Sequence, residues 1–306
     1  MKVLVTGGTG YLGSAIVRAL AHSGHRPVVF ARRAGAVQLP TTAIEGDVRD
    51  KQAVEEAVRQ VDAVCHTAAL VSVWRARSGD FDDVNVHGLE LVLEACEKHR
   101  IQRIVYTSSF LALPPANRSA PLEANDYQRT KVLARVVARR AVEQGLPLTI
   151  LYPGVIYGAG AATEGNLIGR MIRDHLQGRL PGLIGSSRVW SYAHVDDVAA
   201  AHLRALEIET GPHEYVLGGE NVPQIRVFEI VRELTGRPLP RRIPNAAATA
   251  LSFLHEARAR LTGVPPVITR GVVKIFSHDW PLDSSASIDQ LGYRITPLVS
   301  GLRRLV

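Results

Sequence analysis

Short apolar runs alternate with longer amphipathic stretches over the first half of the chain. The runs are rich in β-branched residues, which favours strands, whereas the stretches between them repeat apolar residues with a helical period. The expected strands cover residues 3–5, 28–30, 43–45, 63–66, 104–107 and 148–151, and the expected helices cover residues 10–22, 50–60, 82–99 and 126–144. This alternation predicts an α/β fold with a doubly wound parallel sheet.

The second half of the chain has a looser pattern. Helical periodicity recurs at residues 165–178, 195–209, 224–236, 245–261 and 266–277, between connections rich in Gly and Pro. We therefore expect a first domain over residues 1–155 and a smaller, mainly helical lobe over residues 156–306, with residues 186–222 returning to the first domain. The lobe is expected to cover the carboxyl edge of the sheet, where such folds bind ligands.

A glycine-rich turn joins the first expected strand directly to a helix. Gly7, Gly10 and Gly13 follow the spacing G-x-x-G-x-x-G, one residue longer at its first gap than the dinucleotide fingerprint. The helix end that follows presents unpaired N–H groups and a partial positive charge, which suits a pyrophosphate. We interpret residues 1–155 as a dinucleotide-binding domain. The residues expected to contact the cofactor here are Gly7, Thr9, Gly10, Tyr11, Leu12 and Gly13.

Two arginines, Arg32 and Arg33, follow the second expected strand. Enzymes that use NAD usually carry a carboxylate at this position for the ribose 2′-hydroxyl, whereas an arginine accommodates the 2′-phosphate of NADP. A guanidinium group can bind a phosphate through two parallel hydrogen bonds. The pair therefore favours NADP over NAD, with NAD as the second choice and two solvated loop arginines as the structural alternative.

Further cofactor contacts are expected at the ends of the third and fourth strands. Asp47 is suited to the adenine amino group and Val48 to the adenine ring. Asp47 has a second interpretation as the cap of the helix that begins near residue 50. Ala68 and Ala69 are small enough for the backbone to lie against a flat cofactor, and we expect His66 to be a packed side chain.

A tyrosine and a lysine four residues apart, Tyr127 and Lys131, share one face of an expected helix. The preceding strand ends in the hydroxyls of Ser108 and Ser109. A phenol with a pKa of about 10 needs about 4 kcal/mol to reach pH 7. A neighbouring ammonium and a cationic nicotinamide are able to supply that free energy in a partly dry cleft. We therefore expect acid–base chemistry at these side chains.

Composition excludes several other classes of protein. The chain has 306 residues, of which 46% are apolar, so it can bury a large core. Its net charge of +7 is scattered without a basic stripe, which argues against nucleic-acid binding. Cys65 and Cys96 lie in apolar stretches and indicate reduced core residues. With no metal-ligand spacing, no apolar run of membrane-spanning length and no signal pattern, we expect a cytoplasmic protein without a metal.

Together the motifs resemble the extended short-chain dehydrogenases/reductases, the NAD-dependent epimerase/dehydratase superfamily. Segments in the family's order are Thr6–Gly13, Gly46–Asp50, His66–Ala69, Asn85–Gly88, Tyr106–Ser109, Tyr127–Lys131, Pro153–Gly158 and His194–Ala199. Within the family the chain resembles the dihydroflavonol reductase branch, including farnesol-dehydrogenase-like members. Segments that carry this second resemblance are Tyr106–Leu113, Leu151–Tyr157, Gly178–Gly182 and Tyr215–Asn221. The resemblance implies a Rossmann-type sheet.

The resemblance also implies roles for individual residues. Tyr127 resembles the proton donor or acceptor, and Lys131 the group that lowers its pKa and binds the nicotinamide ribose. Ser109 resembles the residue that holds the substrate oxygen, with Ser108 as the second choice. Asn85 is similar to an asparagine at a helix start near the nicotinamide, and a helix N-cap is its alternative role. Residues implied to lie against the nicotinamide carboxamide are Pro153, Gly154 and Val155.

Two departures from the family pattern concern the substrate. Only 17 residues separate Ser109 from Tyr127, which suggests an open pocket. Trp190–Tyr192 replace an arginine-containing run that binds substrate phosphates in sugar-nucleotide epimerases, and Gly154 replaces a common asparagine. Both replacements favour an uncharged, fairly apolar substrate, although Arg188 keeps a phosphate possible. The candidate substrate residues are Phe110, Arg188, Trp190 and Tyr192, of which the aromatic ones have the core as their alternative place.

These observations favour an NADP(H)-dependent oxidoreductase that interconverts a carbonyl and a secondary or allylic alcohol on a small molecule. The first alternative is a nucleotide-sugar epimerase or dehydratase with tightly bound NAD. The second is a non-catalytic dinucleotide-sensing or assembly subunit, a kind of relative that often loses the Tyr/Lys pair that this chain retains. The family resemblance also suggests a homodimer through the expected helices at residues 82–99 and 126–144.

Overall fold

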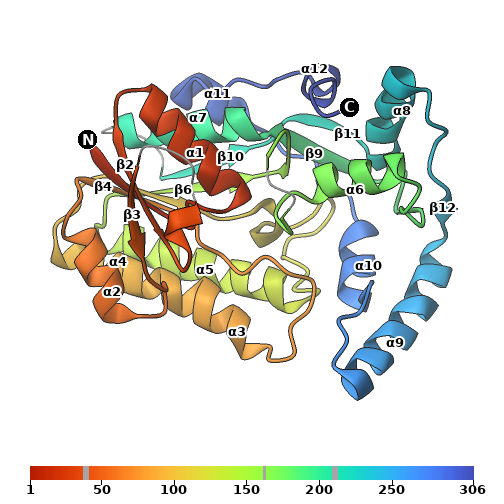
Figure 1. Ribbon diagram of the computed structural model, residues 1–306, viewed down its shortest axis with the longest axis horizontal. Helices are drawn as coiled ribbons and strands as arrows, with labels where there is room; N and C mark the ends of the chain where they lie inside the picture. Colours follow the sequence, from red (N-terminus) through yellow and green to blue (C-terminus); the bar gives the residue numbers. More distant parts are fainter. Residues whose placement is uncertain (37–40, 161–162, 209–212) are drawn as a thin grey trace.

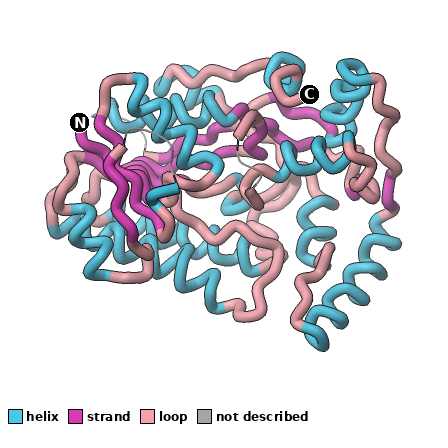
Figure 2. Tube along the Cα trace, in the orientation of Figure 1, coloured by secondary structure: helices cyan, strands magenta, loops and turns pink. Residues whose placement is uncertain are grey.

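A seven-stranded parallel sheet forms the centre of the computed structural model, which describes residues 1–36, 41–160, 163–208 and 213–306 (Figures 1 and 2). The strands lie in the order β10-β6-β5-β4-β1-β2-β3, and every neighbouring pair is parallel. Their bounds are β1 (Lys2–Thr6), β2 (Arg26–Ala31), β3 (Thr42–Glu45), β4 (Ala63–His66), β5 (Ile104–Thr107), β6 (Leu148–Pro153) and β10 (Glu214–Leu217). The strand order reverses between β1 and β4, so a ligand crevice is expected at their carboxyl ends.

Helices cover both faces of the sheet (Figure 1). On one face pack α1 (Tyr11–His22), α7 (Val195–Glu207) and α11 (Ser285–Leu291), and on the other pack α2 (Lys51–Val58), α4 (Gly88–Lys98) and α5 (Asp126–Glu143). Val3 and Val5 belong to the first core layer and Leu4 to the second, because side chains alternate along a strand. The continuous apolar strands and the doubly wound Rossmann fold predicted from the sequence are thereby confirmed.

The helix expected over residues 82–99 is divided into three pieces. It consists of α3 (Gly79–Asp82), one stretch of π-helix, η2 (Asp83–His87), and α4. Arg129 of α5 binds the Asp82 carboxylate through two hydrogen bonds of 2.7 and 2.6 Å. Such π-helical insertions frequently occur beside functional sites. The amphipathic pattern predicts the helical stretch but not the change in its winding.

The second half of the chain contains strands that the sequence analysis missed. A small sheet of β7 (Val155–Tyr157), β9 (Val189–His194) and β11 (Glu220–Pro223) and a pair of β8 (Leu183–Ile184) and β12 (Arg242–Ile243) accompany the helices. The remaining helices are α6 (Leu167–Leu176), α8 (Gln224–Thr235), α9 (Asn245–Thr262), α10 (Arg270–Phe276) and α12 (Leu298–Leu302). The lobe is mainly helical, as predicted, and its strands of two to six residues were missed because they leave little periodic signal.

Part of the second half completes the central sheet. Strand β10 pairs in parallel with β6, and α7 packs against α1. The expected helix over residues 195–209 ends at Glu207 in α7, and residue 209 lies outside the described residues. The domain limits at residue 155 remain a prediction. None of the helices in the described ranges combines the length and the hydropathy needed to cross a bilayer.

Candidate active site

A cavity of about 1290 Å³ lies at the carboxyl ends of the central strands. Most of the residues proposed from the sequence line it. They are Gly7, Thr9, Gly10, Tyr11, Leu12, Gly13, Arg32, Arg33, Asp47, Val48, Ala68, Ala69, Ser108, Ser109, Phe110, Tyr127, Lys131, Pro153, Gly154, Val155 and Trp190. The cavity is large enough for a dinucleotide and a small second molecule.

The turn between β1 and α1 is too tight for a side chain at Gly7 or Gly13. Gly7 has a φ of +69°, and a Cβ atom at Gly13 would stand 2.2 Å from the Gly7 carbonyl oxygen. The N-cap of α1 is Gly10, which has no side chain to bind the N–H groups of the first turn. These groups border the cavity, so the residues present fit a pyrophosphate at the positive end of the helix.

Cationic side chains gather where β2 and β3 end. Arg32 and Arg33 are exposed and line the cavity, and within the described ranges no carboxylate forms an ion pair with either. Asp47 is bound by Arg49 at 3.0 and 2.6 Å, and this hydrogen bonding lowers the pKa of the Asp47 carboxyl. Asp50 caps α2 by accepting from two backbone N–H groups, so the capping alternative for Asp47 is wrong.

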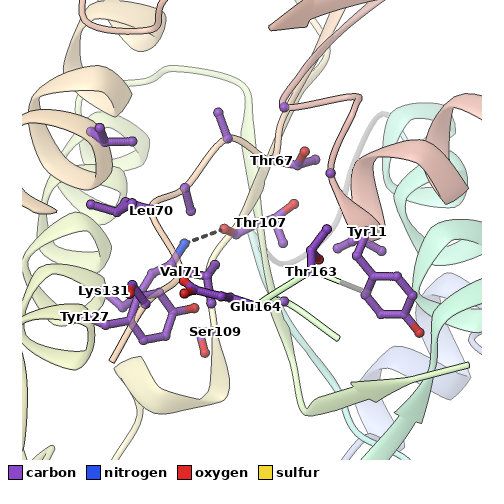
Figure 3. A pocket seen from close by; sticks show the side chains of 18 of the residues that line it. Tyr11, Thr67, Leu70, Val71, Thr107, Ser109, Tyr127, Lys131, Thr163 and Glu164 are labelled. Atoms are coloured by element: carbon purple, nitrogen blue, oxygen red, sulfur yellow. Dashed lines mark hydrogen bonds between the residues drawn. The ribbon is translucent and has the colours of Figure 1, made fainter. Parts of the chain in front are cut away.

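Tyr127, Lys131 and Ser109 gather on one side of the cavity, across from Tyr11 (Figure 3). The first two lie on α5, which is capped by the side chain of Asn125. Lys131 Nζ donates a hydrogen bond of 3.2 Å to the Thr107 carbonyl oxygen at the end of β5. The adjoining strand end and helix thus bring together the three side chains that the sequence proposes for catalysis.

Burial dominates the electrostatics at these side chains. It raises the pKa of Tyr127 to about 12, while a hydrogen bond with Ser109 acts in the opposite direction. Burial also lowers the pKa of Lys131 to about 8. The lowering of the Tyr127 pKa that the sequence predicts from Lys131 is not met in the protein alone, because burial raises this pKa and the opposing contribution comes from Ser109. At neutral pH the phenol keeps its proton and is suited to donate it.

Replacing Lys131 by Met is expected to stabilise the protein without cofactor at neutral pH. An unfolded lysine has a pKa of about 10.4, so between pH 8 and that value the unfolded chain binds more protons than the folded one. The buried ammonium therefore costs about 3 kcal/mol at pH 7, and this cost vanishes as the pH rises toward about 10. Urea unfolding of both proteins at pH 7 and pH 10 measures the difference. A difference independent of pH would contradict the assignment.

Asn85 lies behind the cavity instead of lining it. It is buried inside η2 and accepts a 2.7 Å hydrogen bond from the Leu70 N–H, while its Nδ2 donates to Thr130 Oγ1 at 3.0 Å. The N-cap alternative is wrong, because Asn85 stands within a helical stretch. Its contacts join the loop after β4 to α5, one residue before Lys131, so the side chain is suited to a positioning role.

Two of the four candidate substrate residues line the cavity and two do not. Phe110 and Trp190 line the cavity with their ring centroids 6.1 Å apart. Tyr192 is buried opposite Val155 of β7 and does not line the cavity. Arg188 also lies outside the cavity lining and pairs with Asp279 at 3.2 Å.

His66 is buried at the end of β4, in hydrogen-bond contact with Thr6 Oγ1 at 2.9 Å. Burial lowers the pKa of this histidine to about 3, so it stays neutral. The prediction that His66 is a packed side chain is confirmed.

Close packing explains the glycine at residue 154, because a Cβ atom on Gly154 would stand 2.7 Å from the Ser191 carbonyl oxygen. The asparagine common in epimerases does not fit at this place.

One group of cavity residues was not predicted from the sequence. These residues come from the loop after β4 and from the second lobe, and they include Leu70, Val71, Arg75, Thr163, Glu164, Leu167, Arg170, Val272, Ile275 and Phe276. None of them belongs to a motif with chemical meaning. The amphipathic patterns of α6 and α10 predict helices, but the face that turns toward the cavity depends on tertiary packing.

The glycine turn, the arginines after β2 and the Ser/Tyr/Lys group meet in one cavity of a Rossmann fold, an arrangement typical of enzymes that work with a nicotinamide dinucleotide. The chain belongs to the NAD dependent epimerase/dehydratase family, whose model matches residues 3–218. The protein is thus an enzyme of the extended short-chain dehydrogenase/reductase type, as the sequence resemblance indicates.

Three similar proteins illustrate the range of this family. The chain is 31% identical to sterol demethylase protein B of Methylococcus capsulatus, over 85% of this chain and 83% of that protein. It is 30% identical to a 2-alkyl-3-oxoalkanoate reductase of Stenotrophomonas maltophilia, over 100% and 98% of the two chains. The chain is also similar to the crystal structure of UDP-glucose 4-epimerase from Brucella ovis in complex with NAD. The match covers 99% of this chain and 96% of that one, with 26% identity and a TM-score of 0.75.

Proposed function

We propose that the protein is an NADP(H)-dependent oxidoreductase that interconverts a carbonyl and a secondary or allylic alcohol of a small, largely apolar molecule. The observation that carries this proposal is the meeting of Ser109, Tyr127 and Lys131 in the same cavity that the glycine turn and Arg32 line. The cofactor, when bound, supplies or accepts the hydride. NADPH consumption by the purified protein with a panel of ketones and 3-oxo acids tests the proposal.

The side chains of this chain have separate tasks in the proposed reduction. Tyr127 donates its phenolic proton to the carbonyl oxygen as that oxygen gains negative charge. Ser109 donates a hydrogen bond to the same oxygen and keeps it in line with the phenol. Lys131 holds the nicotinamide ribose and stabilises the phenolate left on Tyr127. Phe110 and Trp190 exclude water from the reacting groups.

Arg32 and Arg33 are expected to select NADP(H). In the R32A/R33A variant the KM for NADPH should rise by about 10- to 100-fold, since two charge-assisted contacts to the 2′-phosphate are lost. The KM for NADH, which lacks that phosphate, should change little. The matched control is R59A, an exposed arginine that does not line the cavity. Equal effects on both cofactors would contradict the role.

The position of Arg170 supports a narrower substrate class, the 3-oxo acids with an alkyl substituent. Its half-buried side chain lines the cavity and forms no hydrogen bond or ion pair with the described residues. Ile275 and Phe276 line the same cavity with apolar surface. One similar protein bears the name of a 2-alkyl-3-oxoalkanoate reductase, whose substrate joins a carbonyl, a carboxylate and alkyl chains. We propose that Arg170 binds such a carboxylate.

Replacing Arg170 by Gln should raise the KM for a 2-alkyl-3-oxoalkanoate by about 10- to 100-fold, because a charge-assisted contact is lost. The KM for the methyl ester of the same acid should stay unchanged. R173Q is the matched control, since Arg173 is exposed one turn further along α6 and outside the cavity lining. An equal loss for acid and ester would refute the assignment.

The nucleotide-sugar epimerase alternative has less support, because Arg188 pairs with Asp279 away from the cavity. The sensing-subunit alternative also has less support, because Tyr127 and Lys131 both line the cavity. For the proposed homodimer, support comes from Leu133 and Val136 of α5, whose apolar side chains are exposed. Light scattering of the purified protein tests this assembly.

A further inference from the structure

Exposed apolar side chains concentrate on one short segment of the second lobe. Thirteen large hydrophobic side chains are exposed among the described residues, and six of them lie within residues 251–267. They are Leu251, Phe253, Leu254, Leu261, Val264 and Val267. Leu251, Leu254 and Leu261 follow the spacing i, i+3, i+10 on one face of α9. This concentration calls for a partner, because exposed apolar side chains are usually scattered singly over a soluble protein.

The segment is also strongly basic. Residues 241–274 contain six lysines and arginines and a single carboxylate, that of Glu256, which accepts a 2.8 Å hydrogen bond from Arg270. The basic residues, all exposed, are Arg241, Arg242, Arg258, Arg260, Arg270 and Lys274. The segment therefore carries a net charge of +5, out of +7 for the whole chain. We call this apolar and basic region, residues 241–274, the α9 surface.

The α9 surface lies at the periphery of the molecule. Helix α9 stands beside α10, away from the central sheet (Figure 1), and Ala248 of α9 packs with Val273 of α10 and with Ile268 of the segment between the two helices. Other residues of α10, namely Val272, Ile275 and Phe276, line the active-site cavity. The apolar wall of the cavity and the exposed leucines thus belong to neighbouring helices.

We propose that the α9 surface docks on an anionic lipid membrane. The leucines and valines would enter the interface between head groups and acyl chains, while the arginines reach the lipid phosphates with their long side chains. A second copy of this chain is a poorer partner, because it would bring two surfaces of charge +5 together. Helix α9 lies on such a membrane and does not cross it.

The position of the α9 surface indicates how docking on a membrane would serve catalysis. If the substrate is largely apolar, which rests on the proposed function, it partitions into bilayers. Docking through α9 would then hold the α10 wall of the cavity beside the membrane in which the substrate is concentrated. Binding to lipid itself does not depend on catalysis and is measured separately.

Flotation of the purified protein with vesicles tests the proposal. We expect binding to vesicles of phosphatidylcholine with 30% phosphatidylglycerol, and at least tenfold weaker binding to pure phosphatidylcholine. In L254E/L261E the binding should fall by about tenfold or more, because two apolar contacts are replaced by charges that the lipid repels. The matched control is I288E/I295E, which makes the same change at exposed residues outside the α9 surface. R258Q/R260Q should weaken binding to the anionic vesicles.

Several outcomes would overturn the proposal. These are no wild-type binding to anionic vesicles, equal binding by L254E/L261E, or an equal loss in I288E/I295E. Light scattering in which L254E/L261E dissociates an oligomer, without vesicle binding by the wild type, would identify an interface between copies instead. Turnover of a water-soluble ketone should be the same in L254E/L261E and the wild type. If neither protein turns over the ketone while the wild type still binds the vesicles, the proposed function alone would be contradicted.

Discussion

Replacing Tyr127 by Phe should lower kcat for carbonyl reduction by about 10³-fold, the usual contribution of a positioned general acid. The phenol is half-buried, keeps its proton at neutral pH and interacts with Ser109, so its hydroxyl is the proton source that the site offers. Phenylalanine retains the ring and its packing against the apolar core of the second lobe. The affinity for NADPH should therefore stay within about twofold of the wild type, since only a hydroxyl is removed.

Steady-state NADPH consumption and a fluorescence titration with NADPH measure these two effects. The matched control is Y215F in β10, outside the cavity lining, which removes a buried tyrosine hydroxyl that has no hydrogen-bond partner among the described residues. This control should keep full activity. An activity of Y127F above one tenth of the wild type, or an equal loss in Y215F, would contradict the role of Tyr127.

A methyl group at Gly13 should abolish tight cofactor binding. Its Cβ atom would stand 2.2 Å from the Gly7 carbonyl oxygen, and backbone atoms cannot rotate away as a side chain does. The β1–α1 turn would have to open, which moves the N-terminus of α1 out of place for the pyrophosphate. We expect NADPH affinity to fall by about 100-fold and the free energy of unfolding to fall by about 3 kcal/mol in G13A.

An NADPH titration and urea unfolding measure the consequences of G13A. Gly35 supplies the control, because a Cβ atom there meets none of the described residues within 4 Å. G35A should match the wild type in both measurements. Unchanged NADPH binding by G13A would show that the turn does not hold the cofactor.

The sequence predicts the central fold well because its signals are local. A buried parallel strand reads as an apolar run, and the turn after β1 needs glycines whatever packs around it. The i, i+4 spacing likewise places Tyr127 and Lys131 on one face of α5. Their meeting with Ser109 follows from the topology, because parallel strands end at the same edge of the sheet.

The rest of the site depends on packing that no local pattern encodes. Trp190 and Tyr192 lie two residues apart on β9 and so on the same face of the strand, yet only Trp190 lines the cavity, whereas Tyr192 is packed in the apolar core of the second lobe. The π-helical turn removes Asn85 from the helix start that its motif suggests. Arg170 belongs to no motif, and its importance appears only once α6 is seen beside the cavity. Desolvation of Tyr127 is equally a property of the folded state.

Hydride transfer from NADPH to a ketone, followed with deuterium at both C4 positions of the dihydronicotinamide, tests the central claim most directly. The purified protein would be given the labelled NADPH and a panel of ketones and 2-alkyl-3-oxo acids. We expect one labelled alcohol for each NADPH consumed by the wild type, and a rate about 10³-fold lower in Y127F. No label in any alcohol, or conversion of a nucleotide sugar by tightly bound NAD without net consumption of NADPH, would contradict the assignment.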